Sequence, residues 1–418
     1  MAGDVQINLP TMFSKALAGE ECLACPAVDR AFHWLLTEGR MLPDLEQFTA
    51  GLTQVLTAGG FPLLRLFLGL RTLHPQIAAT AYIWNRGTDE IEVVSRDHAI
   101  LNSPAYMQSP LRQLYDKRET LIRRRLTGSE AVLDYPVLED MKDAGATDYA
   151  LFGLSFGGEP RGSIAITTDQ PDGFAENQVE GFLALIPLIS LIADARESQR
   201  MAKSLLSIYL GGDAGQQVLG GLVQRGDSRT IAAAIWFCDL RDFTAMSNEL
   251  PRDKVVAVLN DYFDTMAQPV YKHGGEILKF VGDAMLAIFP MQDDLDRDNK
   301  CRIALAAAEE ALDGLRDLND LRASAGKRPL RVGIGLHAGS VSYGNIGALI
   351  GASARLDFTV IGPAVNLAAR IEGLCRELDR PLVASKALAS PCGSKMVSLG
   401  KFNLRGFAKP QEVYGLPH

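Results

Sequence analysis

Apolar and polar residues alternate in short blocks through the first 176 residues. Runs rich in β-branched and aromatic residues predict four strands, at Ala78–Trp84, Ile91–Ser95, Tyr149–Phe156 and Gly162–Thr168. Helical spacing predicts helices at Leu45–Gly59 and Ala105–Lys117. The glycine-rich residues 157–162 predict a hairpin between the last two strands. The pattern is typical of a compact α+β domain, and it contains no catalytic motif.

A long helical pattern follows, from Asn177 to Leu206. Its first half is strongly apolar and its second half is charged, so we expect a helix that packs on the domain and then runs out of it. Pro187 predicts a kink or the start of a new segment. A glycine-rich polar stretch covers residues 211–229. We therefore expect residues 177–227 to be a signalling helix and coupling segment between residues 1–176 and residues 228–418.

The pattern after this segment predicts a second domain. Six strands are expected, at Thr230–Phe237, Glu276–Val281, Ala284–Phe289, Arg331–His337, Val341–Ile346 and Leu356–Ile361. Three helices are expected, at Arg252–Lys272, Asp296–Ala323 and Pro363–Leu378. This β-α-β-β-α-β order is that of the ferredoxin-like fold, with extra strands after it.

Composition narrows the function classes. The 418 residues are 47% hydrophobic and 22% charged, which fits a globular chain of two or three domains. A net charge of −8 argues against nucleic acid or a membrane surface as partner. The apolar runs Phe61–Leu73, which contains two arginines, and Gly181–Ala193 are shorter than the roughly 20 residues of a membrane span. With six scattered cysteines and no signal-peptide pattern, we expect a reduced, cytoplasmic protein.

Two aspartates stand where predicted strands end. Asp239 follows an apolar strand, and Asp283 occupies the turn of a predicted hairpin. Taken singly, each is more often a strand-cap or turn residue, but paired carboxylates suit two divalent ions that bridge phosphate oxygens. Phe243 and Thr244 follow the first aspartate, where a turn that opens a helix offers backbone N–H groups to phosphate.

Five segments in order resemble the class III nucleotidyl cyclase catalytic domain. They are FCDLRDFT, the helix after it, GGEILKFVGDAMLAIF, RVGIGLHAGSVSYGNIG and FTVIGPAVNLAARIE. The resemblance covers residues 228–418. The first half is more loosely similar, mainly in element order, to the GAF-like regulatory domains that precede some bacterial cyclase domains.

The resemblance implies a role for each candidate residue. Asp239 and Asp283, with Leu240, match the positions that bind two divalent cations, Mg²⁺ or Mn²⁺. Lys279 and Thr359 match the purine-reading positions, and this pair favours ATP over GTP because Lys donates to adenine N1 and the Thr hydroxyl accepts from the exocyclic amine. Asn366 and Arg370 match the transition-state pair, which would lie on one helix face. Arg405 falls where the family usually has a phosphate-binding Lys.

The implied activity is that of an adenylate cyclase, which converts ATP into 3′,5′-cyclic AMP and pyrophosphate. The family builds its site between two catalytic domains, so a chain with one such domain implies a homodimer. The alternatives are a guanylate cyclase and a catalytically silent nucleotide-binding partner. The GGDAG of residues 211–215 precedes the domain and does not indicate a cyclic-dinucleotide synthase, and the sequence has no P-loop motif.

The first half is expected to act as a sensor or dimerisation domain. A small molecule or a redox change is the expected signal. Cys22 and Cys25 form a single CxxC, with His33 nearby. One such pair is weak evidence for a metal or redox site, and ordinary packing thiols are the favoured interpretation.

Overall fold

The structure is a computed structural model that describes residues 25–417 except 89, 118, 293 and 352. The chain forms two compact units, residues 1–205 and residues 206–418. The boundary falls within the segment 177–227 that we expected to connect two domains.

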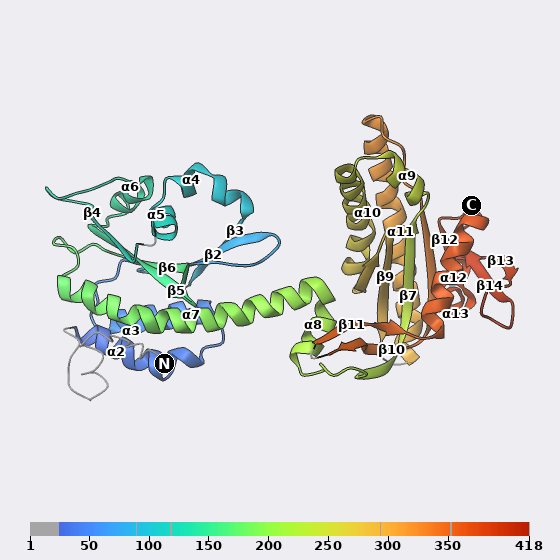
Figure 1. Cartoon of the computed structure of the whole chain (residues 1–418), viewed down its shortest axis with the longest axis horizontal. Coiled ribbons are helices and arrows are strands. Elements are labelled where there is room, and N and C mark those ends of the chain that lie inside the picture. Colours follow the sequence, from blue (N-terminus) through green and yellow to red (C-terminus); the bar gives the residue numbers. More distant parts are fainter. Residues whose placement is uncertain (1–24, 89, 118, 293, 352, 418) are drawn as a thin grey trace. The chain divides into compact units, whose positions relative to one another are not determined.

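The first unit is built on a six-stranded antiparallel sheet in the order β3-β2-β1-β6-β5-β4. The strands are β1 (Arg65–Arg71), β2 (Ile77–Asn85), β3 (Glu92–Asp97), β4 (Leu121–Arg125), β5 (Asp148–Phe156) and β6 (Glu159–Thr168). One face carries α2 (Pro26–Leu36), α3 (Leu45–Ala58) and α7 (Glu176–Leu210). The other carries α4 (Pro104–Met107), α5 (Pro110–Lys117) and α6 (Pro136–Asp143), as Figure 1 shows. Two 3₁₀ turns, Gly39–Met41 and His98–Asn102, complete the unit.

The four strands predicted in this unit are confirmed, and β5 and β6 form the expected hairpin. The predicted helix Ala105–Lys117 is wrong as a single element, because α4 ends at Met107 and α5 begins at Pro110. Proline lacks the N–H that would continue the first helix and fits the first turn of the second. Sequence analysis missed β1 and β4.

Helix α7 is continuous over 35 residues and contains Pro187, which does not start a new segment. Its apolar side chains, including Phe182, Leu185 and Ile189, are buried in the core of the first unit. By length and composition alone the helix could cross a membrane, but 56% of its most apolar stretch is buried inside the protein. This burial is typical of a core helix.

The second unit is an α+β domain with an eight-stranded sheet. The order is β13-β14-β12-β10-β7-β9-β8, and β11 pairs with β10. The strands are β7 (Ser228–Leu240), β8 (Glu276–Val281), β9 (Ala284–Met291), β10 (Val332–Ile350), β11 (Ser353–Ile361), β12 (Leu382–Ser385), β13 (Val397–Phe402) and β14 (Gln411–Gly415). The helices are α8 (Gly212–Leu219), α9 (Phe243–Glu249), α10 (Arg252–Lys272), α11 (Asp294–Ser324), α12 (Pro363–Glu377) and α13 (Lys386–Ala389), with a 3₁₀ turn at Ser390–Lys395.

The sheet of this unit separates two apolar layers. Helices α10 and α11 lie side by side on one face, where Trp236, Tyr262 and Phe289 are fully buried. On the other face, α8 and α12 cover a second core that includes Ile235 and Tyr343. The three predicted helices of this unit and most of its predicted strands are confirmed.

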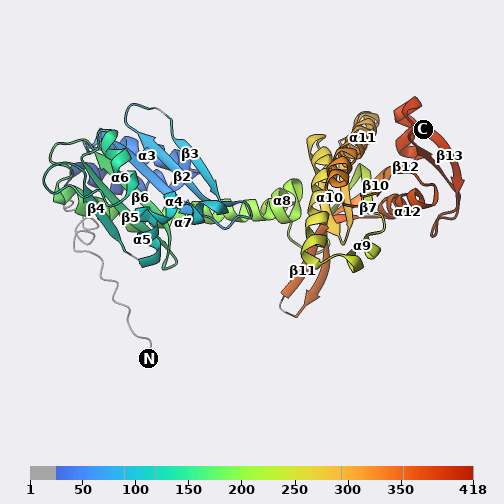
Figure 2. The ribbon, with the colours of Figure 1, turned by 90° about the horizontal axis from the view of Figure 1, so that it is seen from above.

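The prediction of two strands at residues 331–346 is wrong, because β10 runs unbroken from Val332 to Ile350. Its first part pairs with β7, and Ser342–Ile350 pairs with β11. This second pairing continues beyond the start of β7 and forms a two-stranded arm, visible in Figure 2. Leu349 and Ile350 are each 64% exposed near its tip.

The end of the coupling segment belongs to the second unit. Ala214 of α8 is fully buried against the sheet, and Leu210 and Leu222 pack beside it. The Ala214 amide donates to Glu276 Oε1 at 3.2 Å, and the Tyr343 hydroxyl donates to both Glu276 oxygens at 2.9–3.0 Å. Burial raises the pKa of Glu276 despite these bonds. The segment before β7 is therefore fixed to β8 and β10 through one carboxyl group.

His337 gives the second unit a pH-dependent stability. Its ring is buried, Nδ1 lies 2.7 Å from Ser385 Oγ, and burial together with the charge of Arg297 lowers the pKa of His337 to about 4. The unfolded chain takes up this proton near pH 6.5 and the folded chain does so only near pH 4. Stability from this group is therefore present above pH 6.5 and is lost as the pH falls toward 4.

Between pH 6.5 and 4, protonation of His337 should lower the unfolding free energy of the wild-type chain by up to about 3 kcal/mol. We expect the His337→Gln variant to lack this part of the decrease. The measurement is urea unfolding of the full chain at several pH values. Fluorescence of Trp236, in a background with Trp34 and Trp84 replaced by Phe, reports the second unit. If the unfolding free energies of the variant and the parent chain fall in parallel with pH, the assignment of this pH dependence to His337 is contradicted.

Candidate active site

A cavity of about 620 Å³ opens at the end of β7, where the β8–β9 turn and helices α9 and α12 approach one another. Asp239 and Leu240 enter it from the end of β7, and Asp283 enters from the turn. Phe243 and Thr244 line it from the first turn of α9. The structure therefore brings five of the predicted site residues together in one cavity, which we call the acid pocket.

The two aspartates of the acid pocket act on each other electrostatically. Burial, followed by the neighbouring Asp239 carboxyl group, raises the pKa of Asp283 to about 6. Asp239 Oδ1 is buried and has no hydrogen-bond partner among the described residues. A buried acceptor without a donor carries a free-energy cost that a bound cation would remove.

These residues fit divalent cations. Carboxylate oxygens are the preferred ligands of Mg²⁺ and Mn²⁺, and two that repel each other in one pocket favour positive charge between them. Leu240, whose side chain is buried, could contribute only its backbone carbonyl. Asp239, Asp283 and the Leu240 carbonyl are thus the groups that would hold metal.

The turn between β7 and α9 depends on Asp242. This residue has a left-handed backbone, with φ of 62°, which aspartate tolerates better than most residues. Its carboxylate accepts from Arg331 Nη2 at 2.5 Å and from Arg376 Nη2 at 3.4 Å. The two arginines thus contact the turn that precedes Phe243 and Thr244.

Sequence analysis missed Glu372, which lines the acid pocket from α12. Burial, and then the nearby charge of Asp239, raises the pKa of Glu372 to about 7. Helix α12 lies so close to β10 that a Cβ on Gly335 would come within 2.5 Å of the Ala368 oxygen and the Glu372 nitrogen. The signal in the sequence was a glutamate four residues after buried Ala368, on the apolar side of an amphipathic helix.

Lys279 and Thr359 lie outside the acid pocket, on β8 and β11. Lys279 Nζ donates to Asp357 Oδ2 at 2.6 Å. Thr359 is 4% exposed, and its Oγ1 has no partner among the described residues. Asp357 and Thr359 are two apart on one strand, so both side chains face the same way.

The remaining candidates are exposed and do not line the acid pocket. Asn366 and Arg370 lie one turn apart on α12, and Arg405 lies in the loop between β13 and β14. Within one chain the structure therefore separates the acidic group from Asn366, Arg370 and Arg405. Of the CxxC in the first unit, Cys22 lies outside the described residues, and Cys25 is buried where α2 begins.

Comparison with known proteins matches this unit to one family. Residues 227–417 match the family described as adenylate and guanylate cyclase catalytic domain. "Adenylate cyclase 1" of Rhizobium meliloti is 32% identical over 43% of this chain and 26% of its own length. The "Adenylate cyclase" of Anabaena cylindrica is 36% identical over 37% of this chain and 30% of its own length. The chain thus spans less than a third of either relative.

Solved structures include similar domains. The adenylyl cyclase CyaB from P. aeruginosa is 26% identical, with a TM-score of 0.41 over 46% of this chain and 96% of that one. The family match coincides with the unit that holds the acid pocket, and both relatives align over a similar share of the chain. Residues 227–417 of this chain therefore form a class III adenylate and guanylate cyclase catalytic domain.

Proposed function

We propose that the chain is an adenylate cyclase that converts ATP into 3′,5′-cyclic AMP and pyrophosphate. The observation that carries the proposal is the pairing of Asp239 and Asp283 in the acid pocket, with one buried carboxylate oxygen left without a donor. Such a pair is suited to a metal–triphosphate complex. The related proteins named as adenylate cyclases support the same activity.

In the proposed reaction the ribose 3′-oxygen bonds to the α-phosphorus, and the bond from that phosphorus to the β-bridging oxygen breaks. The 3′-hydroxyl proton leaves to solvent, and pyrophosphate departs with the bonding electrons. Two divalent cations, when bound, would supply charge neutralisation and a more acidic 3′-hydroxyl. Asn366 would orient the ribose. Arg370 would donate to the α-phosphate oxygens as their charge grows, and Arg405 would hold the terminal phosphates.

The proposal includes a homodimer with two equivalent sites. The acid pocket and the exposed pair on α12 are separate within one chain, and a twofold axis can bring the acids of one chain to Asn366 and Arg370 of another. Exposed apolar residues beside the relevant elements support this arrangement, among them Phe280 and Val281 on β8 and Ile361 at the end of β11.

ATP is the proposed substrate because of the groups near the purine-reading positions. Lys279 offers only donors, and Thr359 has a hydroxyl without a partner that can accept from the adenine amine. The bond between Lys279 and Asp357 aligns the ammonium group on the strand face that also carries Thr359. Guanine presents the opposite pattern of donors and acceptors.

The first unit is proposed to be a GAF-like regulatory domain, supported by its antiparallel sheet with helices on both faces. For the second unit, the strand order β10-β7-β9-β8 supports the ferredoxin-like interpretation. We also propose a cytoplasmic location, which would give access to ATP. All five described cysteines are free and buried, as expected in a reducing compartment.

The test is product formation by the purified full-length chain, with ATP or GTP as substrate and Mg²⁺ or Mn²⁺ as metal. Cyclic AMP from ATP, with much less cyclic GMP from GTP, is the expected result. Cyclic GMP as the main product would replace the proposal with a guanylate cyclase. Metal-dependent ATP binding without any cyclic product would indicate a regulatory partner.

A further inference from the structure

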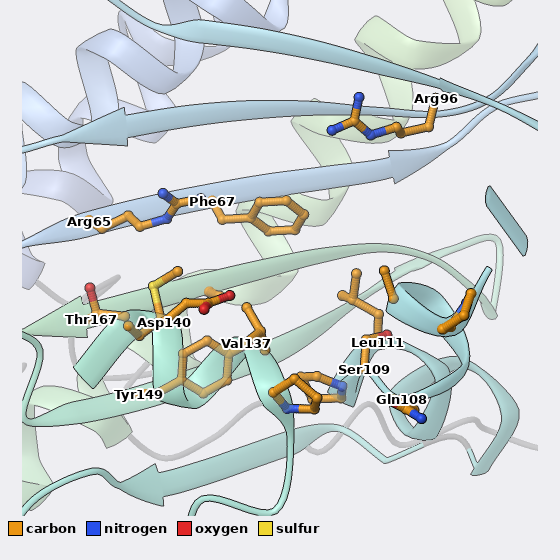
Figure 3. Close-up of a pocket in the computed structure, with 16 residues that line it drawn as sticks. Arg65, Phe67, Arg96, Gln108, Ser109, Leu111, Val137, Asp140, Tyr149 and Thr167 are labelled. Carbon is orange, nitrogen blue, oxygen red and sulfur yellow. The ribbon is translucent and has the colours of Figure 1, made fainter. Parts of the chain in front are cut away.

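The first unit contains a hollow between its sheet and helices α4, α5 and α6. Two cavities of about 480 and 400 Å³ share Arg65, Phe67 and Arg96 among their lining residues. Figure 3 shows the larger cavity, with Phe67 beside the space and Arg65 at one end. The lining residues of both cavities belong to the first unit.

The hollow follows from the alternation of side chains along β1 and β6. Leu66, Leu68 and Ile166 fill the core on one side of the sheet. The opposite side carries Gly69 and Ala165, which are too small to fill the space. A Cβ on Gly69 would come within 2.6 Å of the Phe67 ring, so a larger residue there would displace the aromatic wall.

One end of the hollow is a row of polar side chains. Strand pairing aligns Asn85, Arg65, Thr167 and Tyr149 across four neighbouring strands. Arg65 donates to Asn85 Oδ1 at 3.3 Å, and among the described residues it has no ion pair. Thr167 is 2% exposed, and its Oγ1 has no partner within the described chain. Figure 3 shows Arg65, Thr167 and Tyr149 gathered at this end.

The charges of these groups favour an anion. Burial lowers the pKa of Arg65, so desolvation of its guanidinium is not fully offset by the nearby Glu92 carboxylate. Burial raises the pKa of Tyr149, which keeps its phenol protonated as a donor. Three donors therefore converge where, among the described residues, Asn85 is the one acceptor that is hydrogen-bonded to Arg65. An acceptor with two oxygens would complete the set.

The next row of the sheet is apolar. Pairing places Phe67 between Ile83 and Ala165, and Val137 and Leu111 close the space from α6 and α5. Arg96 and the exposed Asp140 also line the larger cavity, and Figure 3 draws Asp140 on the side of Thr167. The hollow thus has one donor-rich end and an apolar body, and together its cavities have space for a small molecule.

We propose that the first unit binds a small organic anion with one carboxylate on an apolar or aromatic body. The carboxylate accepts two N–H bonds from Arg65 and hydroxyl bonds from Thr167 and Tyr149. The body lies against Phe67 and Ala165. A planar guanidinium is the side chain best matched to a carboxylate, and a single positive group with two neutral donors matches a monoanion better than a dianionic phosphate.

The test is calorimetric titration of the full-length chain with phenylacetate, indole-3-acetate and hexanoate, whose bodies are ring or chain. Phenylacetamide and phenyl phosphate are the matched neutral and dianionic probes. At least one carboxylate is expected to bind about tenfold or more tightly than phenylacetamide. The heat of binding does not depend on cyclase activity, so the result is independent of the proposed function.

Two variants assign the contact. Arg65→Gln should weaken carboxylate binding about tenfold or more, whereas Arg161→Gln, an exposed arginine on the same strand as Thr167, should leave it unchanged. Thr167→Val should weaken binding several-fold while thermal stability is kept or raised, because it removes a buried hydroxyl without a partner. Weaker binding together with unchanged or higher stability would distinguish a ligand contact from a structural role.

Three outcomes would overturn the proposal. They are failure of every carboxylate to bind at about 10 mM, equal binding of acid and amide, and carboxylate binding that neither Arg65→Gln nor Thr167→Val weakens. Preferential binding of phenyl phosphate would also reject the monoanion and assign the polar row to phosphate esters.

Discussion

Mixing an Asp239→Ala chain with an Arg370→Ala chain is expected to restore about a quarter of the wild-type cyclase activity. Each variant alone should be inactive. In the mixed dimer one site combines both lesions, and the other combines an intact acid pocket with an intact Arg370. Random pairing makes half of the dimers mixed, and each has one working site of two.

The result depends on the separation seen within one chain. Asp239 faces the acid pocket, whereas Arg370 is exposed on α12 and does not line it. The matched control is a mixture of Asp239→Ala with Asp283→Ala. Both lesions then fall in acid pockets, so no combination leaves a complete site. Cyclic AMP formation is the measurement, and differently tagged chains verify that mixed dimers form. Mixed dimers without activity would reject the shared site.

Asp283→Asn is expected to lower the rate of cyclic AMP formation about a thousandfold or more. The amide keeps the shape of the side chain but removes the negative charge that would hold metal beside Asp239. The physical basis is that both carboxyl groups line the acid pocket, where burial and the neighbouring Asp239 raise the pKa of Asp283 to about 6. The exposed Asp320 on α11 provides the control variant Asp320→Asn, which should keep full activity.

Folding must be separated from catalysis in this variant. Without metal, the midpoint of thermal unfolding should be unchanged or higher for Asp283→Asn at pH 8, because the wild-type carboxylate is ionised there against its burial and its neighbour. Mn²⁺ should raise the midpoint of the wild-type chain and raise that of the variant less. Retention of more than about a tenth of the activity would contradict the assignment of Asp283.

Helices and strands were predicted well where the hydrophobic periodicity agreed with the positions of glycine and proline. They were predicted less well where a glycine had a packing role. The predicted strands Arg331–His337 and Val341–Ile346 left Gly339 between them, whereas it lies inside β10. A Cβ at this position would come within 2.8 Å of the Ala364 side chain of α12, so the glycine allows the close packing of that helix. Similarly, Arg65 and Arg71 interrupt the apolar run that contains β1. They lie at the two ends of the strand, and every second residue between them is a buried leucine. One-dimensional patterns do not reveal which face of a strand meets a helix.

The candidate site shows the same limit. Sequence analysis placed Asp239 and Asp283 where predicted strands end, and both line the acid pocket. Glu372 was missed because its position in the acid pocket depends on the close approach of α12 to Gly335 of β10. This contact is between residues that are far apart in the chain. The ion pair between Lys279 and Asp357 depends in the same way on two strands that are not consecutive.

The bonds of Glu276 to α8 and β10 affect how this protein can be taken apart and recombined. Residues 206–227 look like linker in the sequence, yet Ala214 and its neighbours complete an apolar layer of the catalytic unit. A chimera that joins a foreign sensor at residue 228 would remove Ala214 and its neighbours from this layer and leave Glu276 without its α8 donor. The exchangeable module therefore begins at Leu206, and a fusion partner joined there keeps α8 with the second unit.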